Sequence, residues 1–161
     1  MKTNFLRLLF ALTVLLVVFS IIANAQSEKN ISVDLVLNST EEKDKSATVS
    51  ATLIIRNTGS TEVKVIHPSY RMAVTFFVMN SLGNIVAPEG LAKINPTLRE
   101  ITIKPNSEVK QSFPNLEFIT GSALFGYELN RGETYRVVAV YRPDGKKSLG
   151  VTTKEQIITI R

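Results

Sequence analysis

Beyond residue 30, apolar and polar residues alternate along most of the chain, and this period of two is typical of β-strands. The alternation runs through residues 31–37 and resumes in residues 47–55, after a charged stretch at 41–45. No window of helical length has the spacing of three to four that marks an amphipathic helix. We therefore predict an all-β chain whose first two strands form a hairpin.

Turn residues divide the rest of the chain into further short strands. Residues 57–60 (Asn-Thr-Gly-Ser) precede a strand containing Val63 and Val65, which Pro68 ends because proline has no N–H to donate to a ladder. Further strands are predicted at residues 71–80, 85–86, 101–103, 109–113, 135–141 and 157–160. Seven to nine short strands with turns at roughly 8–12-residue spacing predict a two-sheet antiparallel sandwich.

One strand carries more apolar side chains than a half-buried strand requires. It presents Phe77 and Met79 on the face opposite to Val74, Phe76 and Val78, so it is apolar on both sides. We expect a loop of the same chain to cover Phe77 and Met79. Exposure of this face to a partner protein is the alternative.

The long connection at residues 115–128 is also rich in large apolar residues. Its apolar residues are Leu116, Phe118, Ile119, Leu124, Phe125 and Tyr127. Long crossings in sandwiches often fold over one end of the core, so we predict that this segment is a plug. A binding role is the alternative.

Residues 129–135, Leu-Asn-Arg-Gly-Glu-Thr-Tyr, resemble the tyrosine corner of immunoglobulin-like and fibronectin type III domains. In those domains a leucine and a glycine precede the tyrosine at these spacings. The resemblance implies that the hydroxyl of Tyr135 bonds back to the chain a few residues upstream and pins the crossing between the sheets. Arg131 stands where proline is often found, which leaves the turn less rigid.

A looser resemblance covers most of the chain beyond its N-terminal segment. Residues 56–59 (Arg-Asn-Thr-Gly), 103–106 (Ile-Lys-Pro-Asn) and 132–141 follow one another as in small bacterial sandwich domains of the intracellular proteinase inhibitor type and in exported immunoglobulin-like proteins. The resemblance implies an immunoglobulin-like two-sheet antiparallel sandwich. It says little about the ligand, because such sandwiches host unrelated functions.

The N-terminal segment has the order of a secretory signal. Lys2 and Arg7 precede an apolar run at residues 8–23, and Ala-Asn-Ala follows at 23–25. We predict a signal peptide at residues 1–25, a single domain at 26–161, and a secreted or periplasmic product that is free of the membrane after cleavage. An uncleaved anchor is the alternative, because the run approaches the length of about 20 apolar residues that spans a bilayer.

The composition limits which interactions can stabilise the domain and which kinds of partner it favours. The chain has no cysteine, so no disulfide supports the domain and an apolar core has to do so. A lipoprotein anchor is less favoured than an uncleaved anchor, because it needs a cysteine at the cleavage point. Loss of Lys2 and Arg7 would lower the formal net charge from +5 to +3, which is too small to favour nucleic acid or acidic lipid as a partner.

No pattern in the sequence indicates catalysis or metal binding. The single histidine, His67, lies before Pro68 and Ser69 with no acid placed to orient it, so we expect a surface or edge residue. In the stretch 41–45, lysines alternate with the acidic residues and cancel the field that a calcium ion requires. We therefore expect no catalytic, cofactor-binding or metal-binding residues.

The function that this sequence favours is that of a non-enzymatic binding or structural module. It would act by protein–protein interaction in the cell envelope or outside the cell. One alternative is a proteinase inhibitor that presents an extended loop, at residues 87–98 or 69–72. Another is a carbohydrate-binding module, although the chain has four tyrosines and no tryptophan to stack on sugar rings.

The signal-peptide prediction can be tested by mass. We expect the exported chain to begin at Gln26 and to be recovered in a soluble fraction, because the small residues at 23 and 25 fit a signal peptidase. Intact-mass measurement of the purified product checks this. A membrane-bound product that retains residues 1–25 would contradict it.

Overall fold

The computed structural model describes residues 30–40, 48–90, 98–116, 118–120, 123–145 and 149–160. The predicted signal peptide at residues 1–25 and the charged stretch at 41–45 lie outside these residues. From Ile31 to Arg161 the chain forms one compact unit.

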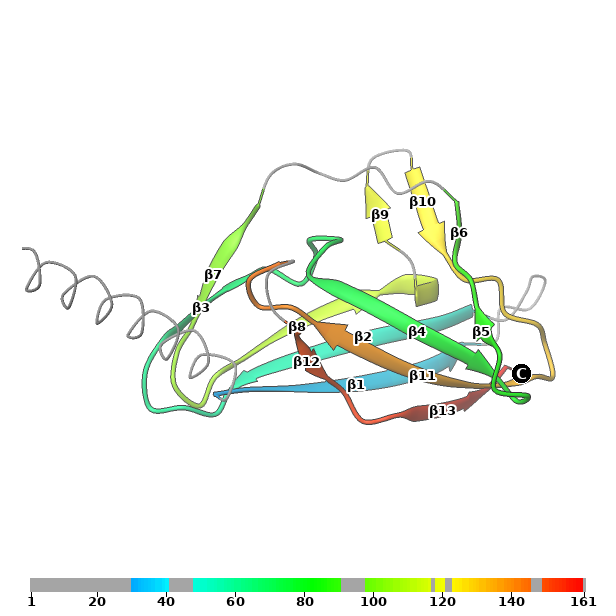
Figure 1. The fold of residues 1–161 in the computed structure, drawn as a ribbon, viewed down its shortest axis with the longest axis horizontal. Helices are drawn as coiled ribbons and strands as arrows, with labels where there is room; N and C mark the ends of the chain where they lie inside the picture. Colours follow the sequence, from blue (N-terminus) through cyan, green and yellow to red (C-terminus); the bar gives the residue numbers. More distant parts are fainter. Residues whose placement is uncertain are drawn as a thin grey trace, which may run out of the picture. The chain divides into compact units, whose positions relative to one another are not determined.

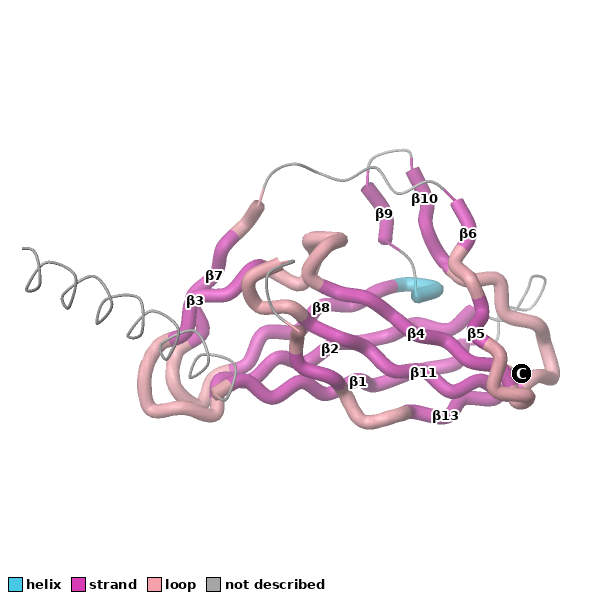
Figure 2. The backbone as a smooth tube through the Cα atoms, viewed as in Figure 1, coloured by secondary structure: helices cyan, strands magenta, loops and turns pink. Residues whose placement is uncertain are grey.

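Within the described residues the protein is built from antiparallel strands, which confirms the predicted all-β class. The strands are β1 (Ile31–Thr40), β2 (Thr48–Asn57), β3 (Val63–Ile66), β4 (Val74–Asn80), β5 (Ile85–Val86), β6 (Glu89–Gly90), β7 (Glu100–Ile103), β8 (Glu108–Phe113), β9 (Phe118–Thr120), β10 (Ala123–Gly126), β11 (Thr134–Tyr141), β12 (Val151–Thr152) and β13 (Gln156–Thr159). One short 3-10 turn, η1 (Pro114–Leu116), follows β8 (Figure 2).

Two larger sheets and two small ones contain these strands (Figure 1). The first has the order β1-β2-β8, and β1 and β2 form the predicted hairpin, in register from Ile31 opposite Asn57 to Thr40 opposite Thr48. The second has the order β12-β11-β4-β5, with β13 also paired to β11. The small sheets are β3-β7 and β6-β10-β9.

The inward faces of the two larger sheets supply the core, so the arrangement is sandwich-like. Along β11 every second side chain is buried, as the alternation predicted. On β2, Leu53 and Ile55 have no exposed surface. The rings of Phe76 on β4 and Phe113 on β8 meet edge to face with centroids 5.1 Å apart, which joins one sheet to the other.

The buried phenol of Tyr141 is paired. The Tyr141 side chain is fully buried, and its hydroxyl donates to the carbonyl of Ile66 at 2.5 Å. Burial raises the pKa of Tyr141, so the phenol stays neutral. An unpaired buried hydroxyl would be costly, so this bond fixes the end of β3 against β11.

Asn57 organises the turn predicted at residues 57–60. Its side chain is buried; the amide donates to the carbonyls of Thr61 at 2.7 Å and Ile103 at 2.9 Å, while its oxygen accepts from the N–H of Gly59 at 2.9 Å. The same residue therefore shapes the turn after β2 and ties it to the end of β7.

The structure corrects three predictions about the strands. The described chain has thirteen β segments rather than seven to nine, because several two- to four-residue strands lack a readable alternation. β4 begins at Val74 and not at residue 71, since Ala73 N–H bonds to Tyr70 O in a turn. Residues 115–128, predicted as a connection, contain β9 and β10.

The hydrogen bond implied by the tyrosine-corner resemblance is present. The hydroxyl of Tyr135 accepts from the backbone N–H of Asn130 at 3.0 Å and donates to Oε2 of Glu133 at 2.6 Å. Burial and the neighbouring Glu133 carboxylate both raise the pKa of Tyr135. The phenol therefore joins the start of β11 to the segment that leads into it.

Removing this hydroxyl should weaken the fold while leaving the packing intact. We expect Tyr135→Phe to lower the free energy of unfolding by about 0.5–1.5 kcal/mol, the net value of such a bond, as measured by chemical denaturation. Tyr70→Phe is the control, because Tyr70 is half-buried and its hydroxyl has no hydrogen-bond partner among the described residues. Equal midpoints for the two variants would contradict the corner role.

Position 150 requires a glycine for two reasons, the backbone angle and the lack of space for a Cβ. Its φ is +84°, and a Cβ there would lie 2.8 Å from the carbonyl oxygen of Tyr141 and from Cγ1 of Val140. Gly132 has the same φ of +84°, but its Cβ would meet nothing within 4 Å. Substitutions at the two glycines therefore distinguish two costs: backbone strain arises at both positions, whereas steric overlap arises only at Gly150.

We expect Gly132→Ala to cost about 1–2 kcal/mol, the penalty of a left-handed angle for a residue with a Cβ. Gly150→Ala should cost more, because β11 backbone would have to shift as well. Thermal or chemical denaturation of both variants measures the difference. Equal losses would show that β12 moves away from β11 at no cost.

Candidate functional site

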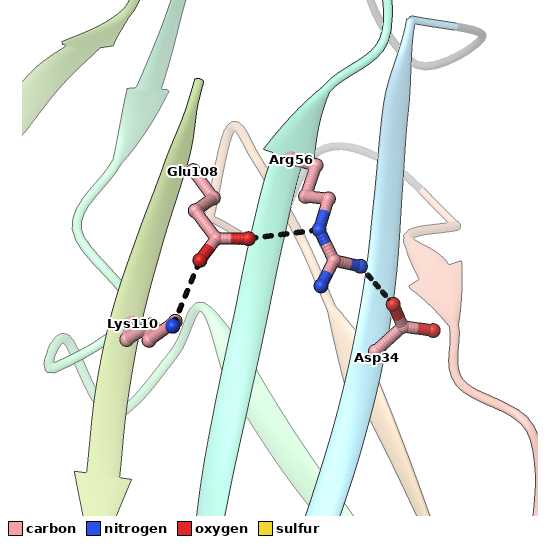
Figure 3. Close-up of polar contacts among 4 residues, drawn as sticks. All are labelled: Asp34, Arg56, Glu108 and Lys110. Atoms are coloured by element: carbon pink, nitrogen blue, oxygen red, sulfur yellow. Dashed lines mark hydrogen bonds and ion pairs between the residues drawn. The ribbon is translucent and has the colours of Figure 1, made fainter. Parts of the chain in front are cut away.

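The two larger sheets present outer faces of opposite character. On the β1-β2-β8 sheet, Asp34, Arg56, Glu108 and Lys110 form a charged ladder across the three strands (Figure 3). The guanidinium of Arg56 bonds to Asp34 through Nη1 and to Glu108 Oε2 through Nε at 2.8 Å, and Lys110 Nζ lies 2.8 Å from Glu108 Oε1.

The side chains of the charged ladder are exposed to solvent. Hydrogen bonds to Asp34 and Glu108 raise the pKa of Arg56, and those from Lys110 and Arg56 lower the pKa of Glu108. The four side chains are 37–59% exposed, and two positive charges balance two negative ones. Exposed ion pairs of this kind contribute little to stability and are screened by salt. The main effect of the ladder is therefore to make this face of the sheet polar.

The outer face of the second sheet is apolar instead. We call Phe77, Met79, Ile85, Val138 and Ile157 the outer apolar face. Strand register brings them together: Val138 lies opposite Phe77, and Met79 lies opposite Ile85. Arg136 completes a row across four strands, since it lies between Ile157 on β13 and Met79 on β4.

Phe77 is exposed, so the prediction that a loop covers it is wrong. Its exposed fraction is 40%, against 69% for Ile85 and 68% for Ile157, while Met79 is half-buried. β5 is only two residues long and pairs beside Met79, so it does not reach over the ring. Tyr127 does not cover it either, because its hydroxyl bonds at the edge of β4, to the carbonyl of Phe76.

Polar groups border the outer apolar face at both ends. At one end the hydroxyls of Thr134 and Thr159 are 2.9 Å apart, and at the other Arg142 Nη1 donates to Thr75 Oγ1 at 3.0 Å. An apolar centre with a polar rim is the usual anatomy of a protein–protein interface.

Arg136 lies within the apolar row, and among the residues that the structure describes its one ion pair is weak. Its Nη1 is 3.8 Å from Oε2 of Glu155, and both side chains are 41% exposed. Arginine, methionine and aromatic residues including phenylalanine are enriched at protein–protein interfaces.

Part of the segment at residues 115–128 contributes to the core, as the plug prediction requires. Leu116 is fully buried, and Tyr127 is half-buried with its hydroxyl donating to Phe76 O at 2.6 Å. Burial raises the pKa of Tyr127. The side chains of residues 118–120 and 123–125 lie outside the described part of the chain, so the plug role rests on Leu116 and Tyr127.

His67 and Ser69 meet in the turn that follows β3, a contact that the sequence analysis did not anticipate. Nδ1 of His67 is 2.8 Å from Ser69 Oγ and accepts from the Ser69 backbone N–H at 3.1 Å. Burial, and then the charge of Arg99, lowers the pKa of His67. Among the described residues no carboxylate bonds to this imidazole, so the contact shapes the turn without forming a triad.

The segments proposed for the alternative functions are arranged differently from the expectation. Residues 69–72 form part of a turn, in which Tyr70 N–H bonds to His67 O at 2.9 Å, and not an extended inhibitory loop. In residues 87–98, Glu89–Gly90 is a strand and 91–97 lie outside the described residues. None of the four tyrosines is exposed.

Sequence reasoning identified Phe77 and Met79 but missed their neighbours. Ile85, Arg136 and Ile157 come from three other strands and join the face only through register. A partial signal existed in Ile157, which lies beside Ile158 in a strand where alternation calls for one apolar residue outside the core.

In the part of the chain that the structure describes, no helix has the length and apolar character to cross a membrane. The same residues include no group of three or more histidine, cysteine, aspartate or glutamate side chains placed to hold a metal ion.

No protein-family model matches the chain, and no curated protein matches its sequence. Among solved structures, it is similar to a Bacteroides uniformis β-glucuronidase, with a TM-score of 0.46 and 15% identity, and to B. uniformis β-glucuronidase 2 bound to cyclophellitol-6-carboxylate aziridine, with a TM-score of 0.45 and 15% identity. Both matches cover 80% of this chain and 13% of the enzyme.

A β-D-glucoside glucohydrolase from Trichoderma reesei is similar with a TM-score of 0.39 and 8% identity, over 81% of this chain and 19% of that enzyme. The chain thus spans less than a fifth of each of these three enzymes. Similarity at this level supports no conclusion about activity.

Proposed function

We propose that this chain is an exported, non-enzymatic, immunoglobulin-like module that binds another protein through its outer apolar face. The observation that carries the proposal is the exposure of Phe77, Ile85 and Ile157 on one face of the second sheet. An antiparallel sheet that faces water normally carries polar side chains there, as the β1-β2-β8 sheet of this protein does.

The composition of the face supports a protein as the ligand. Phe77 supplies an aromatic ring, Arg136 a charge with a weak internal partner, and Ile85 and Ile157 flank them. Hydroxyl groups and Arg142 form the rim. Flat apolar surfaces with an aromatic and an arginine near the centre favour a protein surface over a small molecule, which would need a concave pocket.

One sequence feature supports export, and one hydrogen bond supports the fold family. The order of charged, apolar and small residues in the first 25 positions is that of a cleavable signal. The bond from Asn130 N–H to the hydroxyl of Tyr135 is the interaction expected of a tyrosine corner. A secreted or periplasmic protein partner fits the export signal.

The proposal predicts that Phe77 matters for binding more than for folding. Because the ring is 40% exposed, Phe77→Ser should cost about 1 kcal/mol, well below the 3–5 kcal/mol of truncating a buried phenylalanine. The same change should abolish capture of the partner. A melting curve and an affinity pull-down from the exported fraction of the native cell measure the two effects.

Leu98→Ser is the matched control, because Leu98 is 55% exposed and lies outside the strands that form the face. Leu98→Ser should keep both stability and capture. A stable Phe77→Ser protein that captures every partner of the parent would refute this face as the binding surface. Loss of capture in both variants would point to non-specific adhesion.

A further inference from the structure

The free edge of β1 is a second surface with unusual properties. β1 is the first strand of the β1-β2-β8 sheet, and all ten of its residues pair with β2. Within the part of the chain that the structure describes, no other strand pairs with it. A strand in this position carries a row of backbone donors and acceptors along its open side.

The direction of the hydrogen bonds shows which groups face that open side. On β2, the N–H of Asn57 donates to Ser107 O at 3.0 Å, toward β8. Direction alternates along a strand, so the odd-numbered residues of β2 bond to β8 and the even-numbered residues bond to β1. By the register, the N–H and C=O groups of Val33, Leu35 and Leu37 therefore point to the open edge.

Several other strand edges of the larger sheets are protected. On β8, Glu108 and Lys110 place charges along the edge strand. On β4, the carbonyl of Phe76 accepts from Tyr127, and that of Val74 accepts from Arg71 at 3.4 Å. β5 and β12 are two residues long. Charged side chains, occupied carbonyls and short length are the usual means by which proteins prevent edge pairing.

β1 has fewer of these protections, and Asp34 is the one charged residue in its sequence. It is ten residues long, contains no proline, glycine, lysine or arginine, and its register with β2 runs without a bulge. Its outward side chains include Val36, an apolar residue that is 43% exposed. Such an edge is a template for another extended strand.

We propose that this edge pairs with β1 of a second copy of the chain, antiparallel and centred on Val36. In a symmetric antiparallel pair, residues whose backbone N–H and C=O point to the open edge must lie opposite each other. These are the odd-numbered residues of β1, so the two-fold axis passes through a residue and not between two residues. With Val36 at the axis, the two valines lie opposite each other. Asp34 then lies opposite Asn38 of the second copy, and the carboxylate can accept from the amide.

Side-chain pairing favours this register over its neighbours. A centre at Asp34 would place two carboxylates directly opposite each other, which is unfavourable. A centre at Leu35 would place Val36 opposite Asp34, an apolar group against a charge. The centre at Val36 buries the exposed valine against its own copy and leaves Asp34 opposite a neutral donor.

This pairing is independent of the proposed function, because β1 and the outer apolar face belong to different sheets. Its test uses the full-length chain expressed with its own N-terminal segment and purified after any processing by the host. Sedimentation equilibrium over a range of concentrations measures the dimer dissociation constant. Melting curves confirm that each variant is folded.

Two substitutions at the exposed Asn38 should move the constant in opposite directions. Asn38→Lys creates two Lys–Asp34 pairs across the axis and should tighten the dimer, whereas Asn38→Asp creates two like-charged pairs and should weaken it. Each change should shift the dissociation constant by about 2- to 30-fold, given the usual strength of cross-strand pairs. High salt should shrink the difference between the variants.

Val36→Lys tests the register itself. With the axis at Val36 it places two lysines opposite each other and weakens the dimer, whereas an axis at Leu35 would place each lysine opposite Asp34 and strengthen it. A parent that stays monomeric overturns the proposal, including one that binds a synthetic peptide of residues 31–40 without dimerising. A dimer that responds equally to both Asn38 variants also overturns it.

Discussion

The rest of this structure depends on β11, which is hydrogen-bonded to other strands along both of its edges. β4 pairs with one edge of β11, and β12 and β13 pair with the other, so every second residue must place its side chain in the core. The phenols at its two ends then need partners, which they find in Asn130 and in Ile66. The chain has no disulfide, and these buried bonds together with the apolar core hold the two larger sheets in place.

Because the inward side chains of β11 are fixed in the core, the side chains on its outer face are determined as well. Arg136 and Val138 must point outward because Tyr135 and Val137 point inward. The register with β4 then places Phe77 and Met79 beside them. The polar outer face of the β1-β2-β8 sheet arises by the same rule from Asp34, Arg56 and Lys110. The difference between the faces therefore lies in the outward residues and not in the architecture.

Alternation was sufficient to predict β1, β2 and β11, because each is long enough for a period of two to be read. It failed for β6, β9, β10 and β12, which have two to four residues and owe their existence to neighbouring strands. It also failed for the cover of Phe77, since cover depends on where distant segments lie. The grouping of Ile85 and Ile157 depends on register, and the open edge of β1 on the direction of hydrogen bonds. Neither can be read from one strand.

Placing the two proposed surfaces on different sheets has a consequence for affinity. A dimer joined through β1 would leave the outer apolar face of each copy unpaired, so one assembly would present two identical faces related by a two-fold axis. A partner with two binding sites, or one displayed repeatedly on a surface, would then bind with an effective affinity above that of a single face. Such a gain depends on dimerisation and vanishes when the edge is blocked, whereas the affinity of a single face does not change. The exposed Phe77 of each chain would then support useful binding without enlarging an apolar surface that otherwise favours aggregation.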